Sequence, residues 1–463
     1  MSEKNPISVA SISNVLRATL NGRWTWIIIL FSGIAINGLF ALNPLSTDGS
    51  DRLSGMLRFY CNLLLAFAFC YAVFLKSKRI SHFKVPKNYW YFIVPFALLL
   101  RLLLAQLGGN YDLESFEITA DIILRGDSVY ASTSRYNYGP IWAYWLGALK
   151  FLSSVGGGYN KTLFHSYIVI TLFLAELALL KGIKKHGFSD ISCLILLFNP
   201  VSIILIGHHS QFDIIAIALG YFAYHKLVKQ QMLSGLLLLG LSFSIKHLLV
   251  FLPLVMLFDT QIKLKNRLLL LVIPALIFGL SFLPFLTDLV AIKKNVLSYQ
   301  LNHGQTLFYK LFEIIIPHSF SEFETLQLIP LMNGYKPLWI LSFLVLGYSI
   351  YHYKTGHAFN LYLAYLVASS LAISEQYLLI PVLTIVLYRK QFISWLYLLL
   401  SSYYIMFVSA HNTAKYFNLE SLGIYLPAEW YSIGFAQIQL CLLILVVSVV
   451  LKNKFKESTV SLP

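Results

Sequence analysis

The stretch SIGFAQIQLCLLILVVSVVL, residues 432–451, is mostly apolar and is followed at once by the basic segment KNKFK, residues 452–456. A helix needs about 20 apolar residues to cross the hydrocarbon core of a bilayer. Lysine and arginine accumulate on the cytoplasmic side of such helices. The stretch therefore predicts a membrane-spanning helix whose C-terminal end faces the cytoplasm.

The same pattern recurs along the whole chain. Further long apolar runs lie at 25–43, 57–75, 88–107, 162–181, 190–207, 212–227, 267–285, 337–353 and 391–408. Four shorter runs, at 232–245, 247–259, 359–373 and 377–388, are typical of helix pairs that enter the membrane and return. We predict an all-α polytopic membrane protein with about 14 transmembrane helices and with amphipathic helices on the non-cytoplasmic side.

The composition supports a membrane protein. Of the 463 residues, 58% are hydrophobic and 12% are charged, which leaves too few polar groups to coat a water-soluble globule of this size. The formal charge of +15 is typical of basic cytoplasmic loops, so we expect no nucleic-acid partner. The cysteines lie inside apolar runs without paired spacing and indicate neither a metal site nor a disulfide framework: Cys61, Cys70, Cys193 and Cys441.

The basic clusters predict the topology. They lie at 76–79, 181–185, 226–229, 263–267, 351–357, 388–390 and 452–456. They share one side of the membrane only if residues 140–155 do not cross it, so we expect that segment to be a helix in the membrane interface, with Trp142, Tyr144 and Trp145 at headgroup level. Both termini are then cytoplasmic. The polar segments 110–144, 207–213, 286–336, 374–377 and 409–431 face the opposite side.

The most polar of these segments is NYDLESFEITADIILRGDSVYASTSRYNYGPIWAY, residues 110–144. Apolar residues at helical spacing predict an amphipathic helix over 113–125, with Glu114, Glu117, Asp121 and Arg125 on another face. Of these, Glu117, Asp121 and Arg125 either form a solvated ladder or serve a function. Asp112 stands at the start of this helix. It either caps the helix or serves chemistry, because a carboxylate at the membrane surface is costly to place.

Two further segments carry polar residues at the ends of apolar runs. In GHHSQFD, residues 207–213, His208, His209 and Asp213 indicate either a simple turn or part of a site, and adjacent histidines do not favour one tetrahedral metal site. In SFSIKHLLVFLP, Lys246 and His247 are surrounded by apolar residues. They either face protein, water or a partner charge, or extend to the lipid headgroups.

Two loops predicted to be non-cytoplasmic add further candidates. Basic residues usually lie on the cytoplasmic side, but Lys293 and Lys294 lie in a loop predicted to be non-cytoplasmic. They either bind a lipid-linked phosphate or are simply solvated. Glu375 and Gln376 lie between two short helices. They form either a plain turn or the tip of a re-entrant pair that points into a cavity.

The order of these motifs resembles that of the GT-C superfamily of membrane glycosyltransferases. More narrowly, the chain resembles the dolichyl-phosphate-glucose-dependent glucosyltransferases of the N-glycan precursor pathway, from about residue 90 to about residue 400. The family pattern D-Y-E-A followed by D-Y-P-P-L-T-A-Y is similar to YDLESFEIT followed by YNYGPIWAY, and H-F-Q-Y-N, F-K-Q and H-E-K-S are similar to HSQFD, IKH and SEQY.

The chain departs from that pattern at Asp213, at Ser374 and at Gly139 with Pro140, where the family has Asn, His and Pro-Pro. These changes fall in the donor and acceptor pockets that the resemblance implies. We therefore keep the superfamily but leave the sugar and the acceptor open.

The resemblance implies a catalytic carboxylate at Asp112 that takes the acceptor proton, with no metal and no cofactor. The donor is a polyprenyl-phosphate sugar, and the acceptor is a glycan presented on the non-cytoplasmic side. Candidates for stabilising the leaving phosphate are Lys246, His247, Lys293, Lys294, His208 and His209. Candidates for binding substrate are Glu114, Tyr136, Tyr138, Trp142, Gln211, Asp213, Glu375 and Gln376.

The predicted function is hexosyl transfer by one integral membrane domain over 1–463, with an N-terminal helix pair at 24–87, a catalytic loop at 108–161 and a donor-side loop at 286–336. The alternatives are a flippase for lipid-linked sugars or a polysaccharide transporter, and an inactive assembly subunit. The sequon NKT at 160–162 would suit the endoplasmic reticulum, whereas the short loops favour the plasma (inner) membrane of a prokaryote. Membrane lipids are expected partners.

Overall fold

The computed structural model describes residues 84–298, 306–307, 311, 328–355, 357–370, 373–416 and 434–460. The predicted spans at 25–43 and 57–75 lie outside the described residues, as do Cys61, Cys70, nearly all of the helix pair 24–87 and parts of the loops 286–336 and 409–431. Every regular element within the described part of the chain is helical, which confirms the all-α class.

Five described helices are long and apolar enough to cross a membrane. They include α4 (Trp90–Ala105), α8 (Lys161–Lys185), α14 (Leu264–Ser281), α21 (Phe392–Tyr416) and α22 (Phe435–Val460). The predicted run 190–207 forms α9 (Asp190–Phe198) and α10 (Pro200–Gly207), bent by 47°, and counts as a sixth span if the bent pair crosses as one. The chain is thus a membrane protein by length and composition of its helices, and the larger predicted number of spans stays a prediction.

The remaining predicted runs are also helical. The runs 212–227, 232–245, 337–353 and 359–373 correspond to α11 (Asp213–Val228), α12 (Met232–Ile245), α18 (Leu328–His352) and α19 (Ala358–Ala368). The runs 247–259 and 377–388 each contain two short helices, η3 (His247–Leu249) with α13 (Leu252–Met256), and η6 (Glu375–Leu379) with α20 (Val382–Leu387). These breaks bring backbone and polar side chains to the ends of α12 and α19.

The bend between α9 and α10 has a local cause. The side chain of Asn199 accepts a hydrogen bond from the backbone N–H of Ser202 at 2.7 Å, and its Nδ2 donates to the carbonyls of Ile195 and Leu196 at 2.9 and 2.8 Å. Pro200, which follows, has no N–H for the helix. One asparagine therefore ends the first helix and caps the second.

An ion pair lies beside this bend in the bundle interior. Nη2 of Arg101 on α4 is 2.8 Å from Glu176 Oε2 on α8, and it also donates to the carbonyl of Leu197 at 3.0 Å. Both side chains are fully buried. Removing one partner of such a pair costs about 3–5 kcal/mol, so the pair fixes α4, α8 and the bent helix relative to one another.

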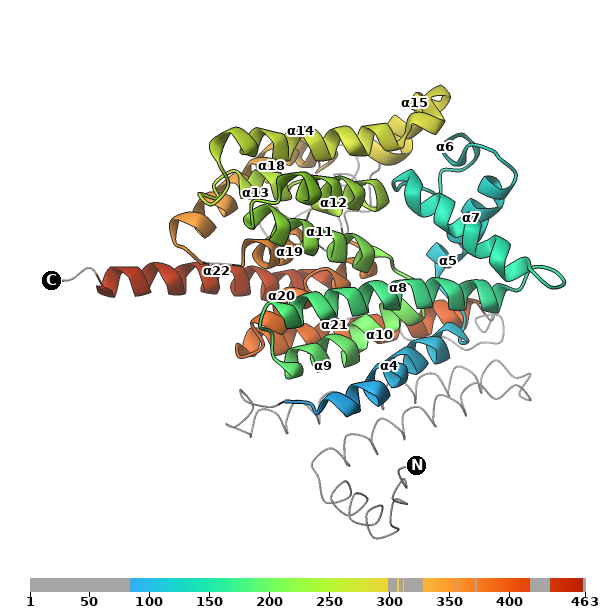
Figure 1. Ribbon diagram of the computed structural model, residues 1–463, viewed down its shortest axis with the longest axis horizontal. Coiled ribbons are helices and arrows are strands. Elements are labelled where there is room, and N and C mark those ends of the chain that lie inside the picture. Colours follow the sequence, from blue (N-terminus) through green and yellow to red (C-terminus); the bar gives the residue numbers. More distant parts are fainter. Residues whose placement is uncertain are drawn as a thin grey trace, which may run out of the picture.

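The long helices lie side by side, and the ends of α8, α21 and α22 that adjoin the predicted clusters at 181–185, 388–390 and 452–456 lie at one end of the bundle (Figure 1). Lys184 Nζ lies 4.6 Å from the ring centroid of Trp90, and the rings of His186 and His225 stack at 3.6 Å. The ring of His357 contacts Tyr388, and the side chain of Gln230 donates to the carbonyl of Gln261. These contacts connect the predicted clusters at 181–185, 226–229 and 263–267 with one another. They also connect the cluster at 351–357 with the one at 388–390.

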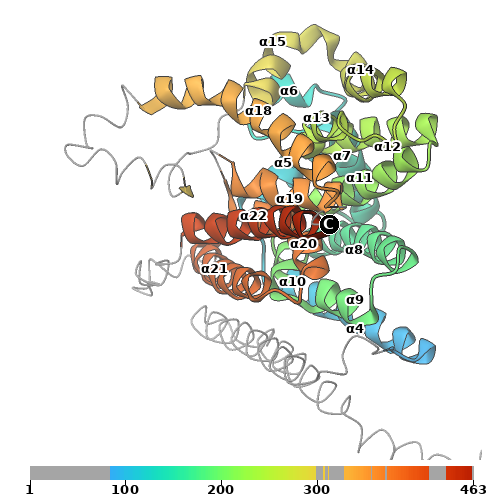
Figure 2. The same cartoon turned by 90° about the vertical axis from the view of Figure 1, so that its left-hand side faces the viewer.

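The helices of residues 110–154 lie at the other end of the bundle (Figure 1). They are α5 (Tyr111–Leu124), α6 (Val129–Ser132) and α7 (Pro140–Ser154), and α5 packs against α7. Next to them lie η4 (Leu283–Asp288), α15 (Leu289–Ile292) and the π-helix η5 (Lys293–Leu297). In the view of Figure 2, α14 and α18 lie above α11 and α22, while α4 and α10 lie below them.

The predicted interfacial helix 140–155 is α7, but one expectation about it is wrong. Trp142 is 2% exposed and stacks against Phe212, so its ring faces the protein interior and not the lipid headgroups. The helix packs against α5, α8 and α12, which bury the face that carries Trp142. Tyr144 and Trp145 are exposed, and their place in the interface stays a prediction.

Candidate functional site

Four polar segments that are far apart in the sequence meet at one end of the bundle. They are the start of α5, the hairpin 207–213 between α10 and α11, the end of α12, and η6. The element pairs α10 and η6, α11 and η6, and α11 and η3 are in contact. Several side chains that are candidates from separate motifs, Asp112, Gln211, Asp213, Lys246 and Gln376, therefore belong to one cluster.

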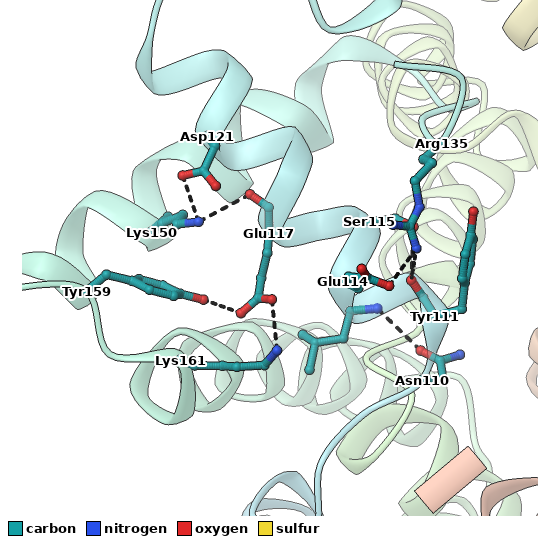
Figure 3. Close-up of polar contacts among 11 residues, drawn as sticks. Asn110, Tyr111, Glu114, Ser115, Glu117, Asp121, Arg135, Lys150, Tyr159 and Lys161 are labelled. Atoms are coloured by element: carbon teal, nitrogen blue, oxygen red, sulfur yellow. Dashed lines mark hydrogen bonds and ion pairs between the residues drawn. The ribbon is translucent and has the colours of Figure 1, made fainter. Parts of the chain in front are cut away.

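The start of α5 differs from the prediction in one respect. The helix begins at Tyr111, and its N-cap is Asn110, whose Oδ1 accepts hydrogen bonds from the backbone N–H groups of Asp112 and Leu113 at 3.1 and 3.3 Å. Figure 3 shows Asn110 bonded to the first turn of the helix. Asp112 is therefore not the cap, because Asn110 already takes that position. Its carboxylate is left for other contacts.

The Asp112 carboxylate is held at one oxygen only. Oδ2 accepts hydrogen bonds from Gln211 Nε2 at 2.5 Å and from Asn110 Nδ2 at 3.2 Å. Oδ1 accepts none from the described residues, and the side chain is half-buried. Burial raises the pKa of Asp112, while the Gln211 hydrogen bond and the nearby charge of Lys246 oppose that rise. The open oxygen can accept a proton from a ligand.

Lys246 is the buried cation of the cluster. Its Nζ lies 2.8 Å from Asp213 Oδ2 and donates to Gln376 Oε1 at 2.8 Å. The ammonium also lies over the rings of Tyr138 and Phe212, 5.0 and 4.8 Å from their centroids. The alternative that Lys246 extends to the headgroups is therefore wrong. An ammonium has three protons, so one remains for a ligand.

Aromatic rings pack beneath this cation. Phe212 stacks on Trp142 at 4.6 Å and meets Tyr138 edge-on at 4.8 Å. The Tyr136 hydroxyl donates to the carbonyl of Gly139 at 2.6 Å, which fixes the turn before α7. Trp142 and Tyr136 are fully buried, so they support the site wall and cannot touch a substrate in this arrangement.

Gly139 explains one departure from the family pattern. A Cβ at this position would collide with the backbone carbonyl of Ser244, on the last turn of α12. The Gly-Pro sequence thus lets the turn before α7 approach α12 just before Lys246. A second proline here would require a different spacing between the two segments.

The histidines of the hairpin are buried and neutral. Burial lowers the pKa of His208 to about 4 and that of His209 well below the ordinary value, so neither ring carries a charge at neutral pH. His209 Nδ1 lies 3.1 Å from Asn110 Nδ2, and its Nε2 lies 2.7 Å from Ser409 Oγ on α21. Stabilisation of a phosphate by these two rings could come only from neutral N–H groups. His247 is half-buried beside Lys246.

Lys293 and Lys294 are exposed on η5, and among the described residues neither forms a hydrogen bond or ion pair with the cluster around Asp112. Their segment is fixed by Asn295, whose Nδ2 donates to the carbonyls of Tyr130 and Thr133 at 3.1 and 3.3 Å. The structure thus attaches this segment to α6 and the loop after it. The role of the two lysines in binding phosphate stays a prediction.

The predicted ladder along α5 is wrong, because its charged residues pair with other segments (Figure 3). Glu117 lies 2.9 Å from Lys161 and accepts a hydrogen bond from Tyr159, and Asp121 lies 2.7 Å from Lys150. These contacts fasten α5 to α7 and α8.

Arg125 pairs instead with Asp127, beyond the end of α5, at 3.0 Å. Glu114, predicted to bind substrate, is exposed and lies 2.8 Å from Arg135, whose guanidinium covers the ring of Tyr111 at 3.8 Å. Whether Glu114 touches a substrate stays a prediction.

Glu375 completes the set of carboxylates. It is half-buried at the start of η6, and burial raises its pKa, with a further contribution from the charge of Asp112. Gln376 is occupied by Lys246. Within the described residues, three carboxylates thus share a region with the ammonium of Lys246, and the predicted phosphate-binding role of the basic residues stays a prediction.

One amide oxygen and one carboxylate oxygen in the cluster are unsatisfied. Oε1 of Gln211 and Oδ1 of Asp213 are buried and accept no hydrogen bond from the described residues. Buried polar atoms are nearly always satisfied, but both side chains are fully buried, so a ligand could reach these oxygens only after the side chains move. In the described part of the chain no group of three His, Cys, Asp or Glu side chains has a geometry that would hold a metal ion.

No protein-family model, no curated protein and no solved structure matches this chain. The resemblance to membrane glycosyltransferases therefore rests on the order of motifs in the sequence. What the geometry adds is a half-buried carboxylate with one open oxygen, a buried ammonium with one unused proton, and two unsatisfied acceptors.

Proposed function

We propose that the protein is a GT-C-like membrane glycosyltransferase that moves a hexose from a polyprenyl (dolichyl or undecaprenyl) phosphate to a glycan acceptor, with Asp112 as general base. The observation that carries the proposal is the Asp112 carboxylate: two amide donors hold Oδ2, and Oδ1 is open. A carboxylate fixed in this way and placed within hydrogen-bond reach of a hydroxyl can accept its proton.

The proposed step is balanced. The acceptor hydroxyl oxygen forms a bond to the anomeric carbon of the donor and passes its proton to Asp112 Oδ1. The bond between that carbon and the phosphate oxygen breaks, and its electron pair stays on the lipid phosphate. The Lys246 ammonium, with one proton unused, supports the growing negative charge.

Acceptor binding is assigned to the unsatisfied oxygens. Because Gln211 and Asp213 are fully buried, their side chains would have to turn toward the acceptor before Gln211 Oε1 and Asp213 Oδ1 could accept hydrogen bonds from sugar hydroxyls. The neighbouring carboxylate of Glu375 would accept a further hydroxyl. This set favours a neutral or cationic acceptor over an anionic one, because carboxylates outnumber ammonium groups around Asp112.

The proposed topology has about 14 spans with the Asp112 cluster on the non-cytoplasmic side, in the plasma membrane of a prokaryote. Support comes from Figure 1, where the helix ends that carry basic segments, such as the C-terminal ends of α8 and α22, lie opposite the end that holds α5 and α7. Positive charge predominates in cytoplasmic loops, so the opposite end is non-cytoplasmic.

The test is to reconstitute the purified protein in vesicles with radiolabelled polyprenyl-phosphate hexoses and glycan acceptors, in the presence of a chelator. Labelled glycan should form with at least one donor, and the exposed control variant Asp127→Asn should transfer at the wild-type rate. Movement of the intact lipid-linked sugar between leaflets without labelled glycan would replace the transferase by a flippase.

A further inference from the structure

The amide of Asn110 has a fixed orientation. Its Oδ1 accepts the N–H groups of Asp112 and Leu113, so Nδ2 points the other way. Nδ2 lies 3.2 Å from Asp112 Oδ2 and 3.1 Å from His209 Nδ1. An amide nitrogen carries two protons, and there is one acceptor for each.

This orientation determines the tautomer of His209. Because the Asn110 amide nitrogen only donates, His209 Nδ1 must accept, and the ring proton must lie on Nε2. Nε2 then donates to Ser409 Oγ at 2.7 Å, and the Ser409 hydroxyl donates to the carbonyl of Ile405 at 2.6 Å. The low pKa of His209, which follows from its burial, agrees with a neutral ring.

A chain of hydrogen bonds therefore connects the start of α5 to α21. It begins at the Asp112 carboxylate, passes through Asn110, His209 and Ser409, and ends on the backbone of α21. Asn110, His209 and Ser409 are buried, so water does not compete for their contacts.

We propose that Asn110 and His209 are positioning residues for Asp112: the Asn110 amide aims the carboxylate, and the neutral His209 ring, anchored on Ser409, fixes the amide. The inference rests on the proposed function, since it gives these residues a purpose in the reaction. Neither residue touches the substrate in this account. His209 is thus removed from the groups proposed to stabilise the phosphate.

The test depends on the charged and titratable groups around Asp112 and His209. Asp112 faces Lys246, Asp213, Glu375 and the phenol of Tyr138, and His209 faces His208 and His165. The variants below alter none of these groups. A change in the titration of Asp112 can therefore be assigned to the hydrogen bonds themselves.

The experiment measures the protonation of Asp112 directly, by infrared difference spectroscopy against pH, using the carboxyl band that Asp112→Asn abolishes. Asn110→Ser keeps a helix-capping oxygen but loses the amide donor. Its Asp112 midpoint should rise by about one pH unit, because a hydrogen bond to a carboxylate favours the charged form. His209→Leu should shift it in the same direction, and His209→Asn, which keeps an acceptor where Nδ1 lies, should restore the wild-type midpoint.

The same variants are assayed for sugar transfer against pH, where the acid limb should move with the infrared midpoint. An unchanged midpoint in Asn110→Ser would overturn the proposal, and an unchanged midpoint in His209→Leu alone would remove His209 from it. If the wild-type protein transfers no sugar, the proposed function fails, while the infrared titration still decides whether the pair orients Asp112.

Discussion

Lys246 and Asp213 form a buried ion pair, with Nζ 2.8 Å from Oδ2, between the end of α12 and the start of α11. The aspartate also lies in the first turn of α11, where the helix dipole favours a negative charge. The pair ties the hairpin that holds Gln211 to the segment that holds Gln376. Its integrity therefore affects both the stability and the shape of the site.

Breaking this pair should be costly on either side. Lys246→Met leaves Asp213 buried without its cation, and we expect a loss of about 3–5 kcal/mol in the free energy of unfolding. Asp213→Asn keeps a hydrogen-bond acceptor for the ammonium and should lose less. Thermal unfolding in detergent compares the two, and wild-type stability of Lys246→Met would show that the ion pair does not form.

The cap of α5 is assigned to Asn110, and that assignment can be separated from the role of Asp112. Asn110→Ala should lose about 0.5–2 kcal/mol of stability, whereas Asn110→Ser should lose little. Asp112→Ala should not show a capping loss. Chemical denaturation of the three variants measures this, and the reverse order, with Asp112→Ala the least stable, would restore Asp112 as the cap.

The raised pKa of Asp112 has a consequence for stability. A carboxyl whose pKa is higher in the folded state than in the unfolded state stabilises the fold at low pH, and that contribution disappears as the pH rises through the folded-state pKa. At neutral pH the charged Asp112 side chain thus lowers the free energy of unfolding. Asp112→Asn should be at least as stable as wild type at pH values near 7, and a markedly lower melting temperature would contradict the direction of the shift.

Ser210 has a left-handed backbone conformation, with φ of 56°, between His209 and Gln211. Glycine adopts this conformation freely, whereas a β-branched residue does not. We expect Ser210→Gly to retain stability and sugar transfer, and Ser210→Val to lose about 1–3 kcal/mol and most of its transfer. Equal behaviour of the two variants would mean that the conformation of the hairpin does not place Gln211 on Asp112.

Long apolar runs made the helices predictable. The apolar runs that form α4, α8, α14 and α22 show no competing pattern, so the positions of these helices follow from the length and composition of the runs. The bend at Asn199 was missed, although an asparagine followed by proline is a signal for a helix start. The prediction treated 190–207 as one span because hydropathy alone does not register a break.

The candidate site was only partly predictable. Asp112, Gln211 and Lys246 stood out because polar groups are costly in apolar surroundings, and the structure brings them together. Asn110 was overlooked because both Asn and Asp are good caps, and sequence does not say which one takes the position. Phe212 carried no signal, since one aromatic residue among so many apolar ones is usually core.

The most direct test of the central claim is sugar transfer by Asp112→Asn, measured in the same vesicles as wild type, with donor binding measured in parallel. A general base contributes about 10²–10⁴-fold to the rate, so Asp112→Asn should bind the donor normally and transfer the sugar slower by that factor. Transfer at the wild-type rate by Asp112→Asn would contradict the account.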